Sequence, residues 1–219
     1  MKITKLELTG VSFGKLDKPF WNSIKKTTSS GGGRLEIHTD EGVVGMAPCG
    51  AGGGRKGTIL GLISQKLIGE DPIRIGYLWD KMYMGGTRKP VAKGDYFGAV
   101  GAVDNALWYL TGKALGQPVW KLAGGVQNRV FAYAAGGYYE EGKEKEDLAA
   151  ELKGYVDTGF KAVKMKVGWP GVTLREDTER VRAARDAIGP DIELMIDANN
   201  AWDARTALRF ARTVEKFDP

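Results

Sequence analysis

The most informative part of this 219-residue sequence is Lys161-Ala162-Val163-Lys164-Met165-Lys166-Val167-Gly168. Alternate side chains of a β-strand point to opposite faces, so positions 162, 164 and 166 share one face and positions 163, 165 and 167 share the other. The second set is wholly apolar and is expected to pack against helices. Lys164 and Lys166 are therefore expected to project together from the other face.

The sequence around this strand repeats a β-α pattern. Strands are predicted at 130–135, 162–167 and 193–198, and helices at 143–158, at 174–188 and from Asp203 towards Phe217. The second helix opens with Thr173-Leu174-Arg175-Glu176, which fits a capping box, and Asp203 can cap the third helix. Three consecutive β-α units predict a parallel sheet.

The residues before this region predict an α+β domain. A strand is expected at 2–13 and a hairpin at 34–48 with its turn at 39–42, and helices are expected at 58–68, 73–84 and 96–115, ending at Gly69, Gly85 and Gly116. The Gly-, Ser-, Thr- and Lys-rich stretch 14–33 predicts a long mobile loop, with Phe20 and Trp21 at its tip.

The texture changes at Leu122-Ala123-Gly124-Gly125, which predicts two domains, 1–125 and 126–219. The second has the β/α pattern of a (β/α) barrel of the TIM type, but a closed barrel typically takes roughly 250 residues. We therefore expect an incomplete barrel with three β/α units, and a chain that is truncated or partial.

The lysine pair and the next strand carry the candidate chemistry. Lys164 and Lys166 would lie near the C-terminal mouth of the barrel, where burial and their mutual repulsion would lower their pKa values and make one of them a base. Asp197 ends the following strand and shares parity with Asn199, so it is a candidate Mg²⁺ ligand. The alternatives are two solvated lysines on an edge strand and an aspartate that caps the turn before Trp202.

Composition limits the class of protein. The 32 basic and 27 acidic residues give a net charge of +5 without a basic stripe, which argues against nucleic-acid binding. One cysteine, Cys49, excludes an internal disulfide, and neither a signal core nor a stretch of membrane-spanning length is present. A cytoplasmic location is expected. Cys49 and the single histidine, His38, are interpreted as ordinary core and strand residues.

Several of these motifs together resemble a known family. The lysine pair and the Asp-x-Asn sequence at 197–199 resemble the mandelate racemase and muconate-lactonizing branch of the enolase superfamily. Two earlier stretches are similar to the family's linker into the barrel: Ala102-Val103-Asp104-Asn105-Ala106-Leu107-Trp108 and Gly112-Lys113-Ala114-Leu115-Gly116-Gln117-Pro118-Val119-Trp120-Lys121-Leu122-Ala123-Gly124-Gly125. The resemblance covers essentially the whole chain and makes residues 1–125 a capping domain.

The resemblance implies Mg²⁺-dependent removal of the proton α to a carboxylate, through an enediolate. Lys166 would be the acid/base group, Lys164 would bind the substrate carboxylate, and Asp197 would be the first of three metal ligands. Asn199 is a weaker candidate for substrate or metal contact, and the loop with Phe20 and Trp21 would close over the substrate. The family's other two metal ligands and its opposing base have no counterpart here, so the chain alone is expected to be inactive.

The expected full-length activity is that of an acid-sugar dehydratase or a racemase/epimerase, that is, a lyase or isomerase acting on a small carboxylate, in a homo-oligomer. A cycloisomerase of the muconate-lactonizing type is an alternative, because it begins with the same proton removal. A second alternative is an inactive fragment that only binds or oligomerises. A third is a dinucleotide-binding oxidoreductase, since residues 52–57 fit G-x-G-x-x-G, which we otherwise interpret as a flexible glycine loop.

Overall fold

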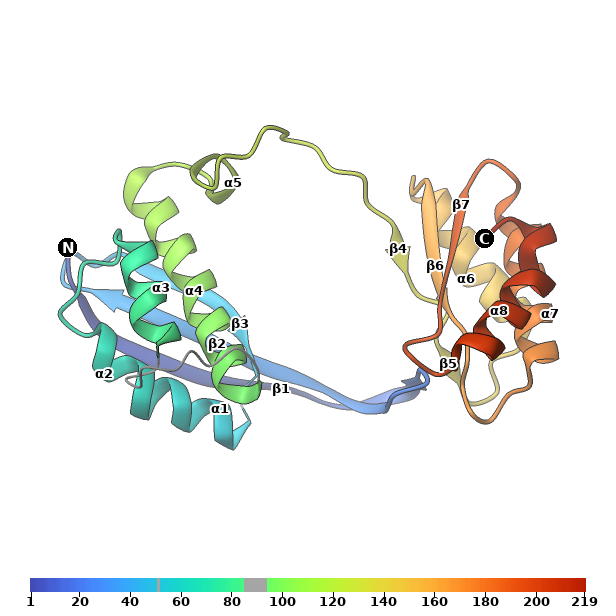
Figure 1. The fold of residues 1–219 in the computed structure, drawn as a ribbon, viewed down its shortest axis with the longest axis horizontal. Coiled ribbons are helices and arrows are strands. Elements are labelled where there is room, and N and C mark those ends of the chain that lie inside the picture. The colour runs from blue at the N-terminus through green and yellow to red at the C-terminus, as the bar shows by residue number, and fades with distance from the viewer. Residues whose placement is uncertain (51, 85–93) are drawn as a thin grey trace. The chain divides into compact units, whose positions relative to one another are not determined.

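The computed structural model describes residues 1–50, 52–84 and 94–219, and its contacts divide the chain into two compact units (Figure 1). The first unit comprises Met1–Gly14 and Gly31–Asn128. The second comprises Lys15–Ser30 and Arg129–Pro219. The chain therefore enters the second unit twice, once through a short N-terminal segment and once through its C-terminal part.

The sheet of the first unit is built from β1 (Ile3–Trp21), β2 (Lys26–Thr39) and β3 (Val44–Cys49), in the order β3-β2-β1. Strands β2 and β3 are antiparallel, and His38 lies opposite Val44. In the turn between them, the Gly42 amide donates to the Thr39 carbonyl over 3.2 Å. The predicted hairpin and its turn are confirmed.

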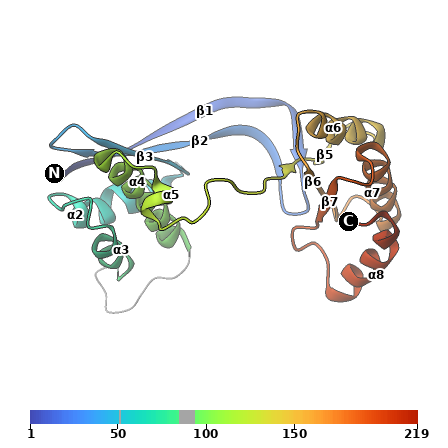
Figure 2. The same ribbon diagram turned by 90° about the horizontal axis from the view of Figure 1, so that it is seen from above.

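Helices cover one face of this sheet (Figures 1 and 2). They are, in chain order, α1 (Gly53–Gly57), the π-helical η1 (Thr58–Ile63), α2 (Ser64–Leu67), α3 (Ile75–Tyr83) and α4 (Gly94–Leu115). The short α5 (Val119–Leu122) follows α4 and contains no buried residue. Helix α4 lies so close to β3 that a Cβ added at Gly45 would be 2.4 Å from the Ala106 carbonyl oxygen. Buried apolar side chains of the strands, η1, α3 and α4 form one core.

The three predicted helices of this unit are confirmed, and the first begins earlier than expected, at Gly53. The expected end of the second, at Gly85, lies outside the described residues. Because Gly53–Gly57 form a helix, the interpretation of residues 52–57 as a glycine loop is wrong. A dinucleotide fingerprint needs a parallel βαβ unit around the glycines. Here the preceding strand, β3, is antiparallel to β2, and further helices follow, so the described residues lack that context.

The prediction of a long loop at 14–33 is wrong, because β1 and β2 continue through it to Trp21 and from Lys26. The turn between them is closed by Asn22, whose side-chain oxygen accepts from the amides of Ile24 (2.9 Å) and Lys25 (3.1 Å). Much of this ribbon is exposed, so its strands need no apolar alternation, and the composition suggested a loop.

The second unit contains a parallel sheet in the order β4-β6-β7. Its elements are β4 (Ala134–Ala135), β5 (Tyr139–Glu140), α6 (Lys145–Asp157), β6 (Ala162–Lys166), α7 (Leu174–Ile188), β7 (Glu193–Asp197), α8 (Ala204–Val214) and the 3₁₀ turn η2 (Glu215–Phe217). The predicted β/α alternation and parallel pairing are confirmed. Of the strand expected at 130–135, only residues 134–135 form a strand. Strand β5 pairs antiparallel with the end of β1, where Phe20 lies opposite Glu140.

The core of this unit lies between the sheet and its helices, which occupy one side of β6 and β7 in Figures 1 and 2. The apolar face of β6, with Val163, Met165 and Val167, is completely buried there against residues of α6, α7 and α8. The predicted capping box at the start of α7 is present, with the Thr173 hydroxyl accepting from the Glu176 amide over 3.2 Å. The packing of the apolar face leaves the lysines on the opposite face.

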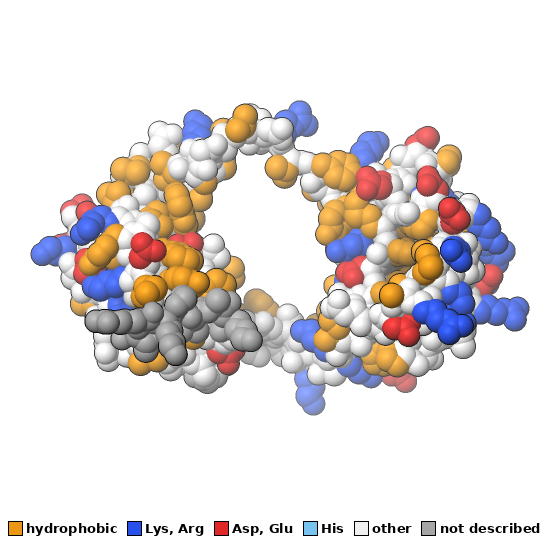
Figure 3. All heavy atoms as spheres, viewed as in Figure 1, with side chains coloured by type: hydrophobic (Ala, Val, Ile, Leu, Met, Phe, Trp, Pro, Cys, Tyr) orange, Lys and Arg blue, Asp and Glu red, His pale blue; other side chains and the backbone are white. Residues whose placement is uncertain are grey.

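Charged side chains of both signs lie on each unit in the face shown in Figure 3. This agrees with the near balance of 32 basic and 27 acidic residues. Over the ranges that the structure describes, no helix combines the length and the apolar character needed to cross a bilayer.

Candidate active site

Parallel pairing brings the two lysines and the aspartate to the same edge of the sheet. In the register of β6 and β7, Lys166 lies opposite Asp197 and Lys164 opposite Met195. The Lys166 ammonium donates to Asp197 Oδ2 over 2.7 Å, and Lys164 Nζ lies 3.7 Å from the same oxygen. Two lysines of β6 thus approach a single carboxylate oxygen on the neighbouring strand β7.

Burial and charge differ among these three groups. Lys166 is only 6% exposed, whereas Lys164 and Asp197 are partly open to solvent. The hydrogen bond from Lys166 holds the pKa of Asp197 below its usual range, so the carboxylate is ionised near neutral pH. The pKa of Lys164 is raised, because its ammonium donates to the Tyr133 hydroxyl over 2.9 Å and also lies near Asp197. The expectation of a lowered pKa is therefore wrong for Lys164.

Aromatic rings surround the lysine pair. Lys164 Nζ lies 4.7 Å from the centre of the Tyr133 ring, and Lys166 Nζ lies 5.5 Å from that of Tyr138. Phe20 packs edge-on against Tyr138, with the ring centres 4.9 Å apart. Sequence reasoning did not select Tyr133, because its place beside Lys164 depends on the pairing of Ala135 with Lys164, which only the structure shows.

A buried ion pair fixes the backbone behind Lys166. Arg180 donates from Nη1 to the Lys166 carbonyl (2.9 Å) and from Nη2 to the Gly137 carbonyl (3.0 Å). Nη1 also lies 2.9 Å from Asp177 Oδ1, and Asp177 is 1% exposed. The sequence does not reveal this network, because an Asp and an Arg three residues apart on a helix resemble an ordinary surface pair.

The loop after β7 meets the tip of the β1-β2 hairpin. The Ser23 hydroxyl donates to the Ala198 carbonyl over 2.6 Å and lies 3.3 Å from the Asn199 carbonyl. Asn199 has a φ of 47°, a left-handed conformation that asparagine tolerates, and its amide donates to Asp197 Oδ1 over 2.9 Å. Its side-chain oxygen is buried and has no hydrogen-bond partner among the residues that the structure describes.

The donor types at this edge suit a hard divalent cation. Mg²⁺ prefers oxygen ligands and is commonly held by one or two carboxylates. Asp197 offers an ionised carboxylate, and the unpartnered Asn199 Oδ1 offers a second oxygen. Among the described residues, Asp197 does not belong to a cluster of three or more His, Cys, Asp or Glu ligand atoms. Within residues 1–50, 52–84 and 94–219, the one such cluster lies in the first unit.

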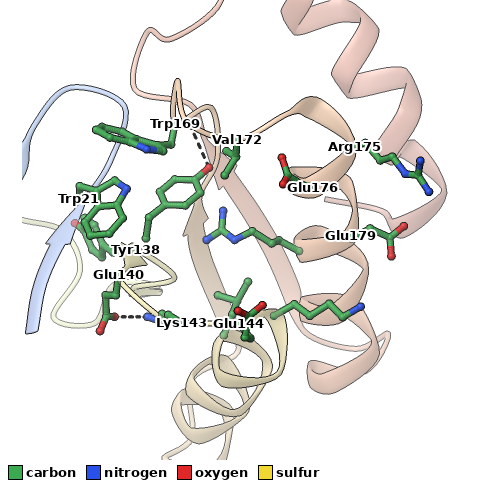
Figure 4. Close-up of a pocket in the computed structure, with 15 residues that line it drawn as sticks. Trp21, Tyr138, Glu140, Lys143, Glu144, Trp169, Val172, Arg175, Glu176 and Glu179 are labelled. Carbon is green, nitrogen blue, oxygen red and sulfur yellow. Dashed lines mark hydrogen bonds and ion pairs between the residues drawn. The ribbon is translucent and has the colours of Figure 1, made fainter.

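A cavity of about 530 Å³ lies in the second unit (Figure 4). Trp21 and Trp169 line it, with their rings 5.8 Å apart, and Glu140 and Lys143 form an ion pair at its wall. Its remaining lining residues are Tyr138, Tyr139, Glu144, Lys145, Leu148, Gly171, Val172, Arg175, Glu176, Glu179 and Arg180. The lysine pair and Asp197 are not among them. Trp21 thus lines this cavity, whereas Phe20 packs against Tyr138, the ring that lies near Lys166.

Both parts of the chain match known domain families. Residues 13–124 match the mandelate racemase / muconate lactonizing enzyme N-terminal domain. Residues 147–219 match the enolase C-terminal domain-like family. The chain belongs to the mandelate racemase / muconate lactonizing enzyme family, with an α+β capping domain and part of a barrel.

Individual relatives support this assignment. Arabinonate dehydratase of Saccharolobus solfataricus is 39% identical over 185 residues, which is 83% of this chain and 49% of the relative. D-galactarolactone cycloisomerase of Agrobacterium fabrum is 33% identical over 210 residues, 95% of this chain and 54% of the relative. A Streptomyces coelicolor racemase crystallised with bound magnesium has a TM-score of 0.87 at 29% identity, covering 99% of this chain and 60% of that one. The chain spans about half the length of the curated relatives it matches.

Proposed function

We propose that this chain supplies the proton-abstracting part of an enolase-type active site. In this proposal Lys166 removes the proton α to a substrate carboxylate, Lys164 binds that carboxylate, and Asp197 is the first oxygen ligand of Mg²⁺. One observation carries the proposal: both lysine ammonium groups approach Asp197 Oδ2, at 2.7 and 3.7 Å, at the carboxyl ends of adjacent parallel strands. Active sites of β/α barrels lie at this end.

The residues fit these roles chemically. Lys164 keeps its positive charge, because Tyr133 and Asp197 both favour the ammonium, and it can therefore pair with a substrate carboxylate. Lys166 can accept a proton only as a neutral amine, whose lone pair takes the proton while an N–H can still donate to Asp197. Bound Mg²⁺ would supply positive charge opposite the negative charge that develops on the substrate carboxylate.

We infer the substrate class from relatives that are named for sugar acids. Two of them are named arabinonate dehydratase and L-talarate/galactarate dehydratase, at 39% and 35% identity. We infer an acid-sugar substrate. The first candidate outcome after proton removal is dehydration, in which the β-hydroxyl is lost. The second is racemisation or epimerisation, in which the same carbon is protonated again. Cycloisomerisation is a further candidate, because the D-galactarolactone cycloisomerase matches 95% of this chain. Self-association stays a prediction.

Exchange of the substrate α-proton tests the proposal. The 219-residue chain, and the longest natural protein that contains it, would be incubated in D₂O with Mg²⁺ and a panel of sugar acids, and loss of the α-proton signal followed by NMR. Lys166→Ala should abolish the exchange. Lys161→Ala, at an exposed lysine just before the same strand, is the matched control and should leave the exchange unchanged.

Retained exchange in Lys166→Ala would contradict the assignment of the base. Absence of exchange in both wild-type proteins, with sugar acids still binding, would instead favour the alternative of a binding module. Lys164→Ala separates the two lysine roles, because loss of a carboxylate-binding group should chiefly weaken substrate binding.

A further inference from the structure

The outer face of the first unit's sheet carries a cluster of three polar side chains. Glu36 and His38 lie two residues apart on β2 and therefore share a face, and Glu7 lies on the neighbouring strand β1. The residues that alternate with them on both strands are buried in the core, which directs these three side chains away from it. The cluster lies entirely within the first unit and is independent of the proposed active site.

The three ligand-type atoms of this cluster face one another. His38 Nε2 lies 3.6 Å from Glu36 Oε2 and 3.7 Å from Glu7 Oε2, and all three atoms lie within 4.8 Å of each other. Both distances from the imidazole nitrogen are too long for a hydrogen bond. In the described part of the chain, His38 Nε2 is buried and has no hydrogen-bond partner, although two carboxylates are next to it.

We propose that Glu7, Glu36 and His38 bind a divalent transition-metal ion such as Zn²⁺. Zinc binds imidazole nitrogen and carboxylate oxygen at about 2.0–2.2 Å in tetrahedral geometry, so two of its ligand atoms are about 3.4 Å apart. The observed separations of 3.6 and 3.7 Å exceed this value by only a few tenths of an ångström. An ion between the three atoms would give the buried nitrogen a partner and would lie between two carboxylate oxygens.

Two neighbouring cations contact the carboxylates of this cluster, and they affect the proposed ligand atoms differently. Arg34 Nε lies 3.1 Å from Glu36 Oε1, the oxygen that does not face His38, and so orients this carboxylate without blocking it. Lys5 donates to Glu7 Oε2 over 2.8 Å and competes directly for the proposed ligand atom. The Lys5 side chain is 61% exposed, so it can move into solvent when a metal ion binds.

The ligand set selects the type of metal. One imidazole and two carboxylates suit Zn²⁺, Cu²⁺ or Ni²⁺, whereas Mg²⁺ prefers oxygen ligands in octahedral geometry. Coordination through Nε2 requires the neutral imidazole with its proton on Nδ1. The site would also join β1 to β2 across the sheet, so metal binding should stabilise the folded first unit.

Calorimetric titration of the 219-residue chain with Zn²⁺ tests the site. His38→Ala and Glu36→Gln should each weaken Zn²⁺ binding at least tenfold, because even loss of a residue that only supports a metal ligand typically costs 10–100-fold. Glu36→Gln keeps the size of the side chain, so it serves as the test if His38→Ala does not fold. Asp17→Asn, at an exposed carboxylate outside the cluster and outside the proposed active site, is the control and should leave this binding unchanged. Zn²⁺ should raise the melting temperature of wild type but not of His38→Ala.

The competing lysine allows a test in the opposite direction. Lys5→Ala should strengthen Zn²⁺ binding, since it frees Glu7 Oε2, whereas Lys18→Ala, which removes the same charge from an exposed position, should not. Equal Zn²⁺ affinity of wild type, His38→Ala and Glu36→Gln would overturn the proposal. Equal strengthening by Lys5→Ala and Lys18→Ala would show attraction by net charge alone and would also overturn it.

Discussion

Replacing Asp177 with asparagine should destabilise the second unit strongly. The Asp177 carboxylate accepts from the Tyr139 hydroxyl (2.7 Å), the Gly168 amide (2.7 Å) and the Arg180 guanidinium (2.9 Å). Asparagine keeps the shape but not the charge, and its NH₂ group must face at least one of these donors. The Asp177→Asn change therefore breaks an ion pair and one hydrogen bond while leaving the other groups in place.

The size of the effect follows from burial. Asp177 is 1% exposed and the Arg180 side chain 14%, and breaking a buried ion pair from one side typically costs about 3–5 kcal/mol. Arg180 keeps its hydrogen bonds to the Lys166 and Gly137 carbonyls, so we expect a loss near the lower end, about 3 kcal/mol. This is a large share of the roughly 5–15 kcal/mol that stabilises a typical domain.

Urea denaturation followed by circular dichroism would measure this loss, and hydrogen–deuterium exchange of α7 and β6 would localise it. With a denaturant dependence near 2 kcal/mol per M, a typical value, the midpoint should fall by about 1.5 M. Asp186→Asn, at an exposed position of the same helix, should change stability by less than about 0.5 kcal/mol. Equal midpoints for the two variants would refute the reasoning.

Three further changes test other parts of the second unit. A Cβ at Gly137 would lie 2.6 Å from a buried methionine side chain, so Gly137→Ala should cost roughly 1–3 kcal/mol more than Gly142→Ala. At Gly142 φ is also positive, but no atom of the described residues lies within 4 Å of an added Cβ. Equal urea midpoints of the two variants would exclude the clash. Phe210→Ala should lower the free energy of unfolding by about 3–5 kcal/mol, because the ring is only 1% exposed. Leu208→Ala, at a 54% exposed side chain, should lower it by less than about 0.5 kcal/mol. A small loss of stability for both variants would contradict the packing. Lys166 lowers the pKa of Asp197 below the unfolded value of about 3.9. The stabilising contribution of this carboxylate is therefore complete above that value and is lost as pH falls through the lower folded pKa. The difference in urea midpoint between wild type and Asp197→Asn should be larger at pH 7 than near pH 2, and a constant difference would argue against the ion pair.

Much of the second unit could be predicted from local patterns. The β/α alternation, the capping box at Thr173 and the side-chain parity of β6 are properties of neighbouring residues, and each is present in the structure. That Lys164 and Lys166 share a face follows from the two-residue period of a strand. That Asp197 lies beside them follows from parallel pairing, since the carboxyl ends of parallel strands meet at one edge.

Other features depended on contacts between residues far apart in the chain. The hairpin at 14–33 is stabilised by strand pairing rather than by an apolar pattern, so its composition suggested a loop. Tyr133 reverses the expected pKa shift of Lys164, and it does so across 31 residues of sequence. A pKa depends on every charge and hydrogen bond around the group, and no local pattern encodes that environment.

The same division applies to the cluster of Glu7, Glu36 and His38. From sequence alone His38 was an ordinary strand residue, because one histidine without a nearby ligand motif predicts nothing about metals. Sequence alone determined that Glu36 and His38 share a face, since they are two residues apart on one strand. Only the tertiary structure decided that Glu7 joins them, because the pairing of separate strands sets which side chains become neighbours across a sheet.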